Sequence, residues 1–547
     1  MKTSKVLLLL TAAACAAVCL FVLATLPPSA RRLEAGAQNR SQPVVAGVFH
    51  VHTQRSDGTG TVDDVAAAAA RAGLQFVVFT DHGDGTRPPD AQSYRSGVLC
   101  IDGVEISTTG GHYAAIGMRP APYPLGGEPR DVVEDVTRLG GFGVAAHPDS
   151  PKLALRWRDW STPFDAVEWL NADTQWRDKS AVTLTHTFLE FLLRGPESLA
   201  SLFGRPDMTL ARFDALTRQR RVVALAGADA HARLGFRNST DPYQEGFALH
   251  LPSYESVFRA FAIRAQLDRP LAGRAGADAM AVRAAIAAGH VYTAIDALAT
   301  PPAFDFTARS GSFSARAGDD LALGGPVEVD ARANDPAAQV VLFENGRRVA
   351  DGGGTVHYRA PERAAVFRVE VDAPNASGRP PIPWILSNPI YVGGLLDARQ
   401  PIVRALPTVA RPVFDATPTG DWNTSLRTEH DAHSRATVRV DPNGPVALEY
   451  ALAPASFVSQ YAALAYPVGK FIYTYYVNHS GDDSGLADLA GITPTGSYVR
   501  IRRINPRNGD IMFDYQQSRA PLNVQFDGNM IQFVFRKEVQ VLKFLSL

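Results

Sequence analysis

The stretch that decides the fold is GVFHVHTQRSDGTGTVDDVAAAAARAGLQFVVFTDHGDG, residues 47–85. It opens with an apolar run that ends at His50, and His52 follows directly. It closes with a second apolar run that ends at His82. Short apolar runs bounded by polar and glycine residues are typical of buried strands. The stretch therefore predicts two strands with histidines at their carboxyl ends.

The segment between these strands predicts a helix, because Thr61 is a good N-cap and Gly73 a good stop for the alanine-rich run. Strand, helix, strand is a βαβ unit, and the alternation recurs toward residue 300. Further helices are predicted over 131–141 and 209–220, each followed by a strand, over 142–148 and 222–231. The pattern predicts an α/β domain over 45–300 with a parallel sheet, either open or closed into a barrel.

Composition narrows the class of protein. The chain has 547 residues, too many for one compact core, and a formal net charge of −1 without a long Lys/Arg run argues against nucleic acid as a partner. Cys15 and Cys19 lie near the N-terminus, which leaves only Cys100 in the body of the chain. Neither an intrachain disulfide there nor a cysteine-based zinc site is available, so a metal would need His and carboxylate ligands.

The N-terminus predicts export. Lys2 and Lys5 precede the uncharged apolar segment 6–26, which has the length of a membrane-spanning helix. Residues 1–44 are therefore interpreted as a signal or anchor segment followed by a tether. Membrane anchoring is favoured over cleavage, for which AGA at 35–37 is a candidate site, and either outcome predicts a periplasmic or extracellular protein.

Beyond residue 300 the pattern changes to alternating strands separated by Gly, Asn and Asp. We predict two all-β, sandwich-like units, a β-sandwich over 301–395 and a β-rich domain over 413–547, joined by a proline-bearing linker over 396–412. After about Gly469, Tyr, Ile, Asn and Lys become more frequent, for which we have no physical account. Recognition of a glycan and packing on the first domain are the two roles left open for these units.

Residues of metal-ligand type recur where apolar strands of the first domain end. Because the carboxyl ends of parallel strands open on one face, such residues converge in space. Asp57 ends no predicted strand and taken alone is a turn residue; its place in the set is implied by the family resemblance given below. The set comprises His50, His52, Asp57, His82, Glu105, His112, His147, Asp229 and His231.

The order H-x-H, S-D-G, T-D-H, strand-end Glu, G-H, A-H-P and D-x-H resembles the PHP (polymerase and histidinol phosphatase) metallohydrolases. Together with the segment PWILSNPIYV, the chain looks closest to the subfamily named after carbaryl hydrolase. The resemblance implies a distorted barrel of about seven βα units. It also implies three divalent metal ions: one on His50, His52, Glu105 and Asp229, one on Glu105, His112 and His147, and one on Asp57, His82 and His231.

Imidazole and carboxylate ligands suit Zn, Mn or Fe. A water shared by two cations loses a proton near neutral pH and becomes the nucleophile, and Asp229 could accept or relay that proton. The leading hypothesis is a phosphoesterase acting on a small phosphorylated ester through a metal-bridging hydroxide. A carboxylic or carbamate ester hydrolase on the same metals and a non-catalytic envelope binding protein are the alternatives. Substrate-binding residues are not identified.

Other polar residues near the set have two interpretations each. Asp81 is expected to orient a ligand rather than to bind metal. Glu168 either lines the pocket or serves structure. Arg55 and Arg233 either contact an anionic substrate or lie on the surface. His186 is expected on a helix face or in the core.

Overall fold

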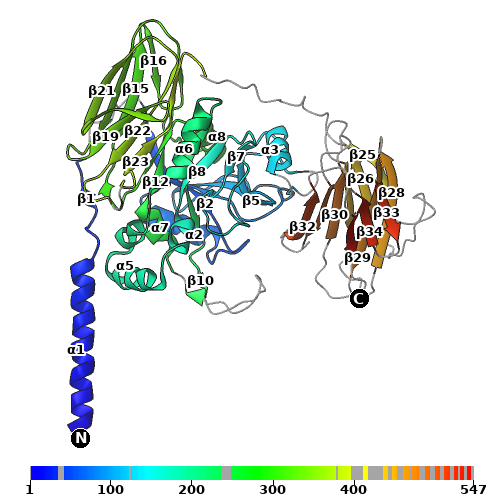
Figure 1. The fold of residues 1–547 in the computed structure, drawn as a ribbon, viewed down its shortest axis with the longest axis horizontal. Helices are drawn as coiled ribbons and strands as arrows, with labels where there is room; N and C mark the ends of the chain where they lie inside the picture. Colours follow the sequence, from blue (N-terminus) through cyan, green and yellow to red (C-terminus); the bar gives the residue numbers. More distant parts are fainter. Residues whose placement is uncertain are drawn as a thin grey trace.

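The computed structural model describes residues 2–34, 42–121, 125–126, 129–235, 248–249, 251–376, 378, 380–395 and, beyond these, only strands between Arg411 and Lys543. Helix α1 (Lys2–Thr25) projects from the body of the molecule (Figure 1). Within the ranges described, no helix is both long and apolar enough to cross a membrane.

Seven strands close into a barrel. They pair in the order β2–β3–β5–β6–β7–β8–β9, and β9 pairs back with β2. All of these pairs are parallel except those of β6, which runs antiparallel to both of its neighbours. The strands are β2 (Val44–Val51), β3 (Phe76–Phe79), β5 (Val98–Thr108), β6 (Gly111–Ile116), β7 (Phe142–Ala145), β8 (Ala166–Asn171) and β9 (Val223–Ala230).

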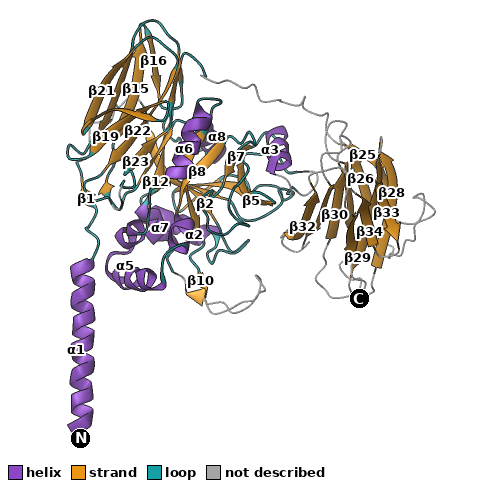
Figure 2. Cartoon of the chain, viewed as in Figure 1, coloured by secondary structure: helices purple, strands orange, loops and turns teal. Residues whose placement is uncertain are grey.

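Helices occupy only some of the connections between these strands (Figure 2). The connection from β3 to β5 carries a short strand, β4 (Ser93–Arg95), and a tight turn joins β5 to β6. A tight turn can join only antiparallel strands, because a parallel pair needs a long crossover. The barrel is closed as expected, but one helix per strand is not found. The helices in the connections between barrel strands are α2 (Val62–Arg71), α3 (Pro129–Arg138), α4 (Ala172–Arg177), α5 (Ala181–Ser201) and α6 (Asp207–Thr217).

Helix α2 begins and ends as its sequence predicts. The Thr61 side chain accepts from the Asp64 backbone N–H, and the Asp64 carboxylate accepts in return from the Thr61 backbone, which is a capping box. The helix ends at Ala72, and Gly73 follows with φ of 77°, a left-handed conformation that costs glycine little. Local signals thus fix the crossover between the first two barrel strands.

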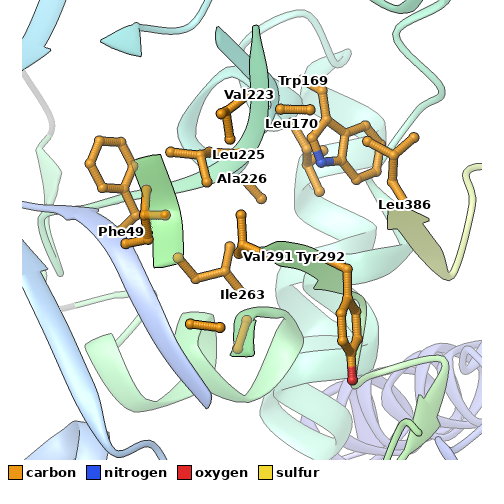
Figure 3. Packing of buried hydrophobic residues seen from close by; sticks show 14 of the residues in the cluster. Phe49, Trp169, Leu170, Val223, Leu225, Ala226, Ile263, Val291, Tyr292 and Leu386 are labelled. Atoms are coloured by element: carbon orange, nitrogen blue, oxygen red, sulfur yellow. The ribbon is translucent and has the colours of Figure 1, made fainter. Parts of the chain in front are cut away.

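The sheet continues past the barrel. Strand β12 (Ala262–Gln266) pairs antiparallel with β2, and β13 (Val291–Ala294) pairs with β12. Strand β23 (Ile385–Ser387) then pairs with β13, so hydrogen bonds cross the predicted boundary at residue 300. Buried side chains pack where these strands meet β8 and β9, among them Phe49, Leu225, Ile263 and Val291 (Figure 3). Trp169 also donates from Nε1 to Thr293 Oγ1 at 3.0 Å.

In the segment predicted as a sandwich, the described regular elements are all strands. One sheet has the order β16–β15–β18–β21, and β18 alternates buried and exposed residues throughout. The other strands extend the sheet that leaves the barrel, except β14, which lies just before this segment and pairs with β1. Bounds are β14 (Ala299–Thr300), β15 (Phe304–Ser310), β16 (Phe313–Arg316), β17 (Asp320–Leu321), β18 (Val327–Ala333), β19 (Gln339–Glu344), β20 (Arg347–Gly353), β21 (Thr355–Ala360), β22 (Ala365–Asp372) and β24 (Ile390–Val392).

Ionic contacts also join this segment to the barrel's helices. The guanidinium of Arg368, on β22, forms a two-point contact with the Asp214 carboxylate on α6. Glu370 on the same strand accepts from both Arg205 and Arg368. Remaining elements in this half are β1 (Arg31–Arg32), which pairs with β14, and β10 (Leu234–Gly235), β11 (Ala248–Leu249), α7 (Tyr254–Ala260) and α8 (Ala275–Ala288).

The C-terminal part forms strands wherever it is described. These lie in sheets with the orders β25–β26–β27–β30–β31–β32, β28–β29 and β33–β34–β35. The predicted linker 396–412 lies almost wholly outside the described residues. The strands are β25 (Arg411–Ala416), β26 (Arg435–Val440), β27 (Val446–Ala451), β28 (Gln460–Val468), β29 (Phe471–His479), β30 (Ala487–Ile492), β31 (Val499–Ile504), β32 (Ile511–Gln517), β33 (Asn523–Asp527), β34 (Met530–Val534) and β35 (Val539–Lys543).

Candidate metal centre

All nine side chains predicted as metal ligands meet in one group, which we call the nine-residue cluster. They come from strands β2, β5, β6 and β9 or from the loops that follow β2, β3, β7 and β9. The members are His50, His52, Asp57, His82, Glu105, His112, His147, Asp229 and His231, and every one lies within 3.7 Å of another member.

Glu105 lies at the middle of the cluster, and its two oxygens face different histidines. Oε1 lies 2.9 Å from both His112 Nδ1 and His147 Nε2. Oε2 lies 3.2 Å from a nitrogen of each of three other rings, those of His50, His52 and His82. A carboxylate in this position can bridge two cations, as the sequence predicts for this residue.

Two aspartates, Asp57 and Asp229, also lie close to histidines of the cluster. Asp229 Oδ1 lies 3.5 Å from His50 Nε2 and 3.3 Å from His52 Nε2. Asp57 Oδ1 lies 3.2 Å from His231 Nε2 and 3.5 Å from His52 Nδ1. The two rings of His52 and His231 stack with centroids 4.2 Å apart.

Four overlapping sets of these residues have donor atoms close enough to hold one ion each. Two match the predicted sharing closely, because Asp57, His82 and His231 fall together with His52, and His50 and His52 fall with Asp229. The third predicted group differs, since Glu105 is shared between one set with His50 and His147 and another with His82 and His112. The arrangement fits divalent cations, while their number is not fixed by it.

Several donor atoms in the cluster have no hydrogen-bond partner although they are buried. His50 Nε2, His52 Nε2, His147 Nδ1 and Asp57 Oδ1 are in this state among the described atoms. Buried polar atoms are costly unless satisfied, and two ligands of a common ion lie about 3–3.5 Å apart when each bond is about 2.1 Å. The separations of 3.2 to 3.5 Å around His50 and His52 fall in that range. The residues therefore fit a bound cation.

Glu168 and Asn171 support the cluster from β8. Glu168 Oε1 lies 2.6 Å from His50 Nδ1, and its Oε2 accepts from the His147 backbone N–H at 2.7 Å. Asn171 Nδ2 donates to Glu168 Oε2 at 2.9 Å and reaches Asp229 Oδ2 at 3.2 Å. A carboxylate behind a histidine fixes its tautomer and leaves the other nitrogen free for metal. Orientation of His50 by Glu168 is a supporting role that the sequence pattern did not specify.

Asp81 is not in contact with a histidine, contrary to the simplest form of its predicted role. Its carboxylate accepts from the Thr53 N–H at 2.7 Å, from the Thr53 hydroxyl at 2.9 Å and from the Ser56 hydroxyl at 2.8 Å. Ser56 Oγ in turn lies 3.3 Å from His52 Nδ1. Asp81 therefore orders the loop that carries Asp57, and it acts on His52 only through Ser56.

Three members of the cluster have a left-handed backbone. The φ angles are 66° at His50, 31° at His147 and 46° at Asp229. Such angles are rare outside glycine and accumulate at functional sites, where surrounding contacts maintain them. The register between β2 and β9 also shifts between Phe49 and Val51, so His50 sits at an irregularity of the barrel wall.

The pKa values of the buried carboxyl and imidazole groups depend on their charged neighbours in the cluster. Burial alone would raise the pKa values of the Glu105, Asp57 and Asp229 carboxyls, yet neighbouring imidazoles hold all three well below the usual range. Burial likewise opposes protonation of His52, but Asp229 and Glu105 raise its pKa to about 10. In the described part of the chain, no Lys or Arg forms an ion pair with Glu105, Glu168 or Asp229. Cations bound among these side chains would supply the missing charge.

Residues that the sequence reasoning missed also hold the site. Asn171 could have been found, because it ends strand β8 as the ligands end theirs. Tyr254, on α7, gives no sequence signal, although its hydroxyl lies 2.8 Å from the His52 carbonyl oxygen and accepts from the Gly60 N–H at 3.2 Å. Arg55 is paired with Asp90 and Asp102 rather than with the cluster.

No family model matches the chain. One stretch is 28% identical over 138 residues to the uncharacterized protein MJ1587 of Methanocaldococcus jannaschii, covering 23% of this chain and 80% of that protein.

Two solved structures are similar in part. One is a two-domain protein from Bacteroides vulgatus containing a predicted PHP-like metal-dependent phosphoesterase, with 12% identity, a TM-score of 0.30 and coverage of 66% of this chain and 98% of that one. The other is a putative metal-dependent phosphoesterase from Bifidobacterium adolescentis, with 14% identity, a TM-score of 0.22 and coverage of 41% and 94%.

Proposed function

We propose that the protein is a PHP-type metal-dependent hydrolase that cleaves a phosphoester of a small molecule. The observation that carries the proposal is the position of Glu105, whose two oxygens lie within 3.2 Å of five imidazole nitrogens. A carboxylate that bridges two cations stands among the imidazoles that share those cations, and Glu105 belongs to two of the possible ligand sets. The order of the motifs along the chain supports the same family, and the carbaryl-hydrolase-like subfamily remains part of the proposal.

Three divalent cations are proposed, shared as the motif order implies, with Glu105 bridging and His50 oriented by Glu168. When bound, such cations lower the pKa of water to near neutrality and neutralise charge on a phosphoryl oxygen. Asp229 is the proposed catalytic residue. Its carboxylate faces His50 and His52 with Oδ1, while Asn171 holds Oδ2. A carboxylate fixed in this way can accept a proton from the attacking water and keep its own orientation.

The alternative chemistry, hydrolysis of a carboxylic or carbamate ester, would use the same cluster, so substrate choice must be measured. The test is metal analysis of the purified full chain, together with turnover of phosphomonoesters, phosphodiesters, aryl esters and aryl carbamates. His50→Ala and Asp229→Ala are expected to lower phosphoester turnover by more than about 100-fold. His357→Ala is the matched control, because this histidine lies exposed on β21 and pairs with Asp330.

Unchanged metal content and turnover in both cluster variants would contradict a metal-dependent enzyme. Turnover restricted to aryl esters or carbamates would keep the metals and replace the substrate class. Export, with anchoring through residues 1–44, is proposed alongside this activity and would place the substrate outside the cytoplasm.

A further inference from the structure

Helix α5 presents an apolar face to solvent. Val182 is 79% exposed, Leu192 64%, Leu193 57% and Phe188 39%. With 3.6 residues per turn these four side chains lie on one arc of roughly 140°. Thr187 and Glu190, which lie on the other side, are buried. A helix on the surface of a soluble protein normally shows the reverse arrangement, with its polar side toward water.

This face adjoins a second exposed apolar helix. The last turns of α1 contact α5, where Thr25 Oγ1 is hydrogen-bonded to His186 Nε2 at 2.7 Å and the Phe21 and His186 rings lie 5.2 Å apart. The chain that follows stays attached, because Arg194 donates to the Pro27 carbonyl and the Ala30 N–H donates to Glu197 Oε1. Figure 1 shows α1 leading away from the body at the point where it meets α5.

Described side chains of α1 are also apolar and exposed, including Leu20, Phe21 and Leu23. The exposed apolar side chains of the two helices therefore adjoin where Phe21 and Thr25 contact His186, and we treat them as one apolar surface with α5 at the base of α1. Exposed apolar patches of this kind mark an interaction site. Phe21 and Thr25 of α1 contact His186 of α5. A flat surface that binds the C-terminal end of α1 would therefore also contact α5.

We propose that this surface docks on a lipid bilayer, with the apolar face of α5 embedded at the level of the headgroups beside α1. An interfacial helix lies in the plane of the membrane with its apolar side buried by about 5–10 Å. In this arrangement α5 lies on the bilayer and does not cross it. Because α5 follows β8 and α4 in the chain, contact at α5 sets the orientation of the barrel relative to the membrane surface.

The proposal is tested with the full chain reconstituted into vesicles of phosphatidylcholine and phosphatidylglycerol. Leu193→Trp adds a fluorophore on the apolar face of α5, and subtracting the spectrum of the unsubstituted chain, which has six Trp, isolates its emission. Its emission is expected to shift to shorter wavelength on vesicle binding and to lose roughly half or more of its intensity when the lipids are brominated near the headgroup. The matched control is Met280→Trp, because Met280 is 58% exposed on α8 and should show neither change.

Two outcomes would overturn the proposal. Quenching of neither variant would mean that α5 does not meet lipid, and equal quenching of both would mean that lipid contact is not specific to the face of α5. A blue shift of the Leu193→Trp emission that depends on protein concentration in detergent and resists brominated lipid would assign the face to a second copy of the chain. Neither measurement uses metal or turnover, so the result is independent of the proposed activity.

Discussion

His50 Nδ1 lies 2.6 Å from Glu168 Oε1, and both side chains are fully buried. The carboxylate requires a proton on Nδ1, which leaves Nε2 as the nitrogen that faces Glu105 and Asp229. A residue outside the nine-residue cluster thus decides which atom of His50 is offered to a metal.

Glu168→Gln is expected to weaken metal binding by about 10–100-fold, because the amide can present a donor to Nδ1 and no longer fixes the ring's tautomer. Competition with a chelator of known affinity measures the change. Glu344→Gln is the matched control, since Glu344 is a buried glutamate on β19 that pairs with Arg363. Equal losses in the two variants would attribute the effect to general destabilisation.

Gly227→Ala is expected to disturb the contact between Glu168 and His50. A Cβ at this position would stand 1.9 Å from Glu168 Oε1, far inside contact distance, so the carboxylate would have to leave His50. Overpacking of this kind costs about 1–3 kcal/mol. We expect a lower Tm and a lower metal content. Gly276→Ala, on helix α8 with nothing within 4 Å of its Cβ, should leave the metal content unchanged and should not lower the Tm, because alanine favours a helix over glycine.

Substitutions at Asp57 and at Glu105 are expected to remove different amounts of bound metal. Asp57 belongs to one of the four possible ligand sets, whereas Glu105 belongs to two. Asp57→Asn should therefore lose about one equivalent of metal and Glu105→Gln about two, by elemental analysis of dialysed protein. Identical stoichiometry in the two variants would contradict the bridging position of Glu105.

Asp372 is expected to make stability fall with rising pH. Burial, with Glu370 nearby, raises the pKa of its carboxyl to about 6. A raised carboxyl pKa favours the protonated form in the folded state, so stability is lost as pH rises from about 4 to about 6. Asp372→Asn should raise the Tm at pH 7 and leave it unchanged at pH 4. Asp178→Asn, at an exposed site, should show no such difference; a pH-independent gain at position 372 would refute titration of this carboxyl as the cause.

The location of the cluster could be predicted because parallel strands bring their carboxyl ends together. This rule placed His50, His82, His147 and Asp229 correctly although they are far apart in sequence. Glu105 follows the same rule, because it lies toward the carboxyl end of β5, which runs parallel to β3. His112 reaches the cluster for another reason, since the tight turn after β5 places it on the antiparallel strand β6. The sequence pattern showed no sign of this reversal, so the implied arrangement of about seven βα units is found only in part, with β5 and β6 joined without a helix.

Contacts that depend on distant pairing were the least predictable. Asp81 was expected to orient a ligand, but its partners depend on how the loop after β2 folds back onto β3. The hydrogen bonds between β13 and β23 join residues about ninety positions apart, and no local pattern encodes their register. Capping signals such as Thr61, by contrast, act over three residues and were correct.

The sheet that runs from β2 through β12 and β13 to β23 limits where the chain can be truncated or joined to another protein. A chain cut near residue 300 would keep every member of the nine-residue cluster but would leave the outer edge of β13 without its neighbour. Open strand edges recruit other chains and promote aggregation. The barrel and the strands up to β24 therefore belong to one folding unit. A gene fusion or chimaera that keeps the barrel must also keep these strands.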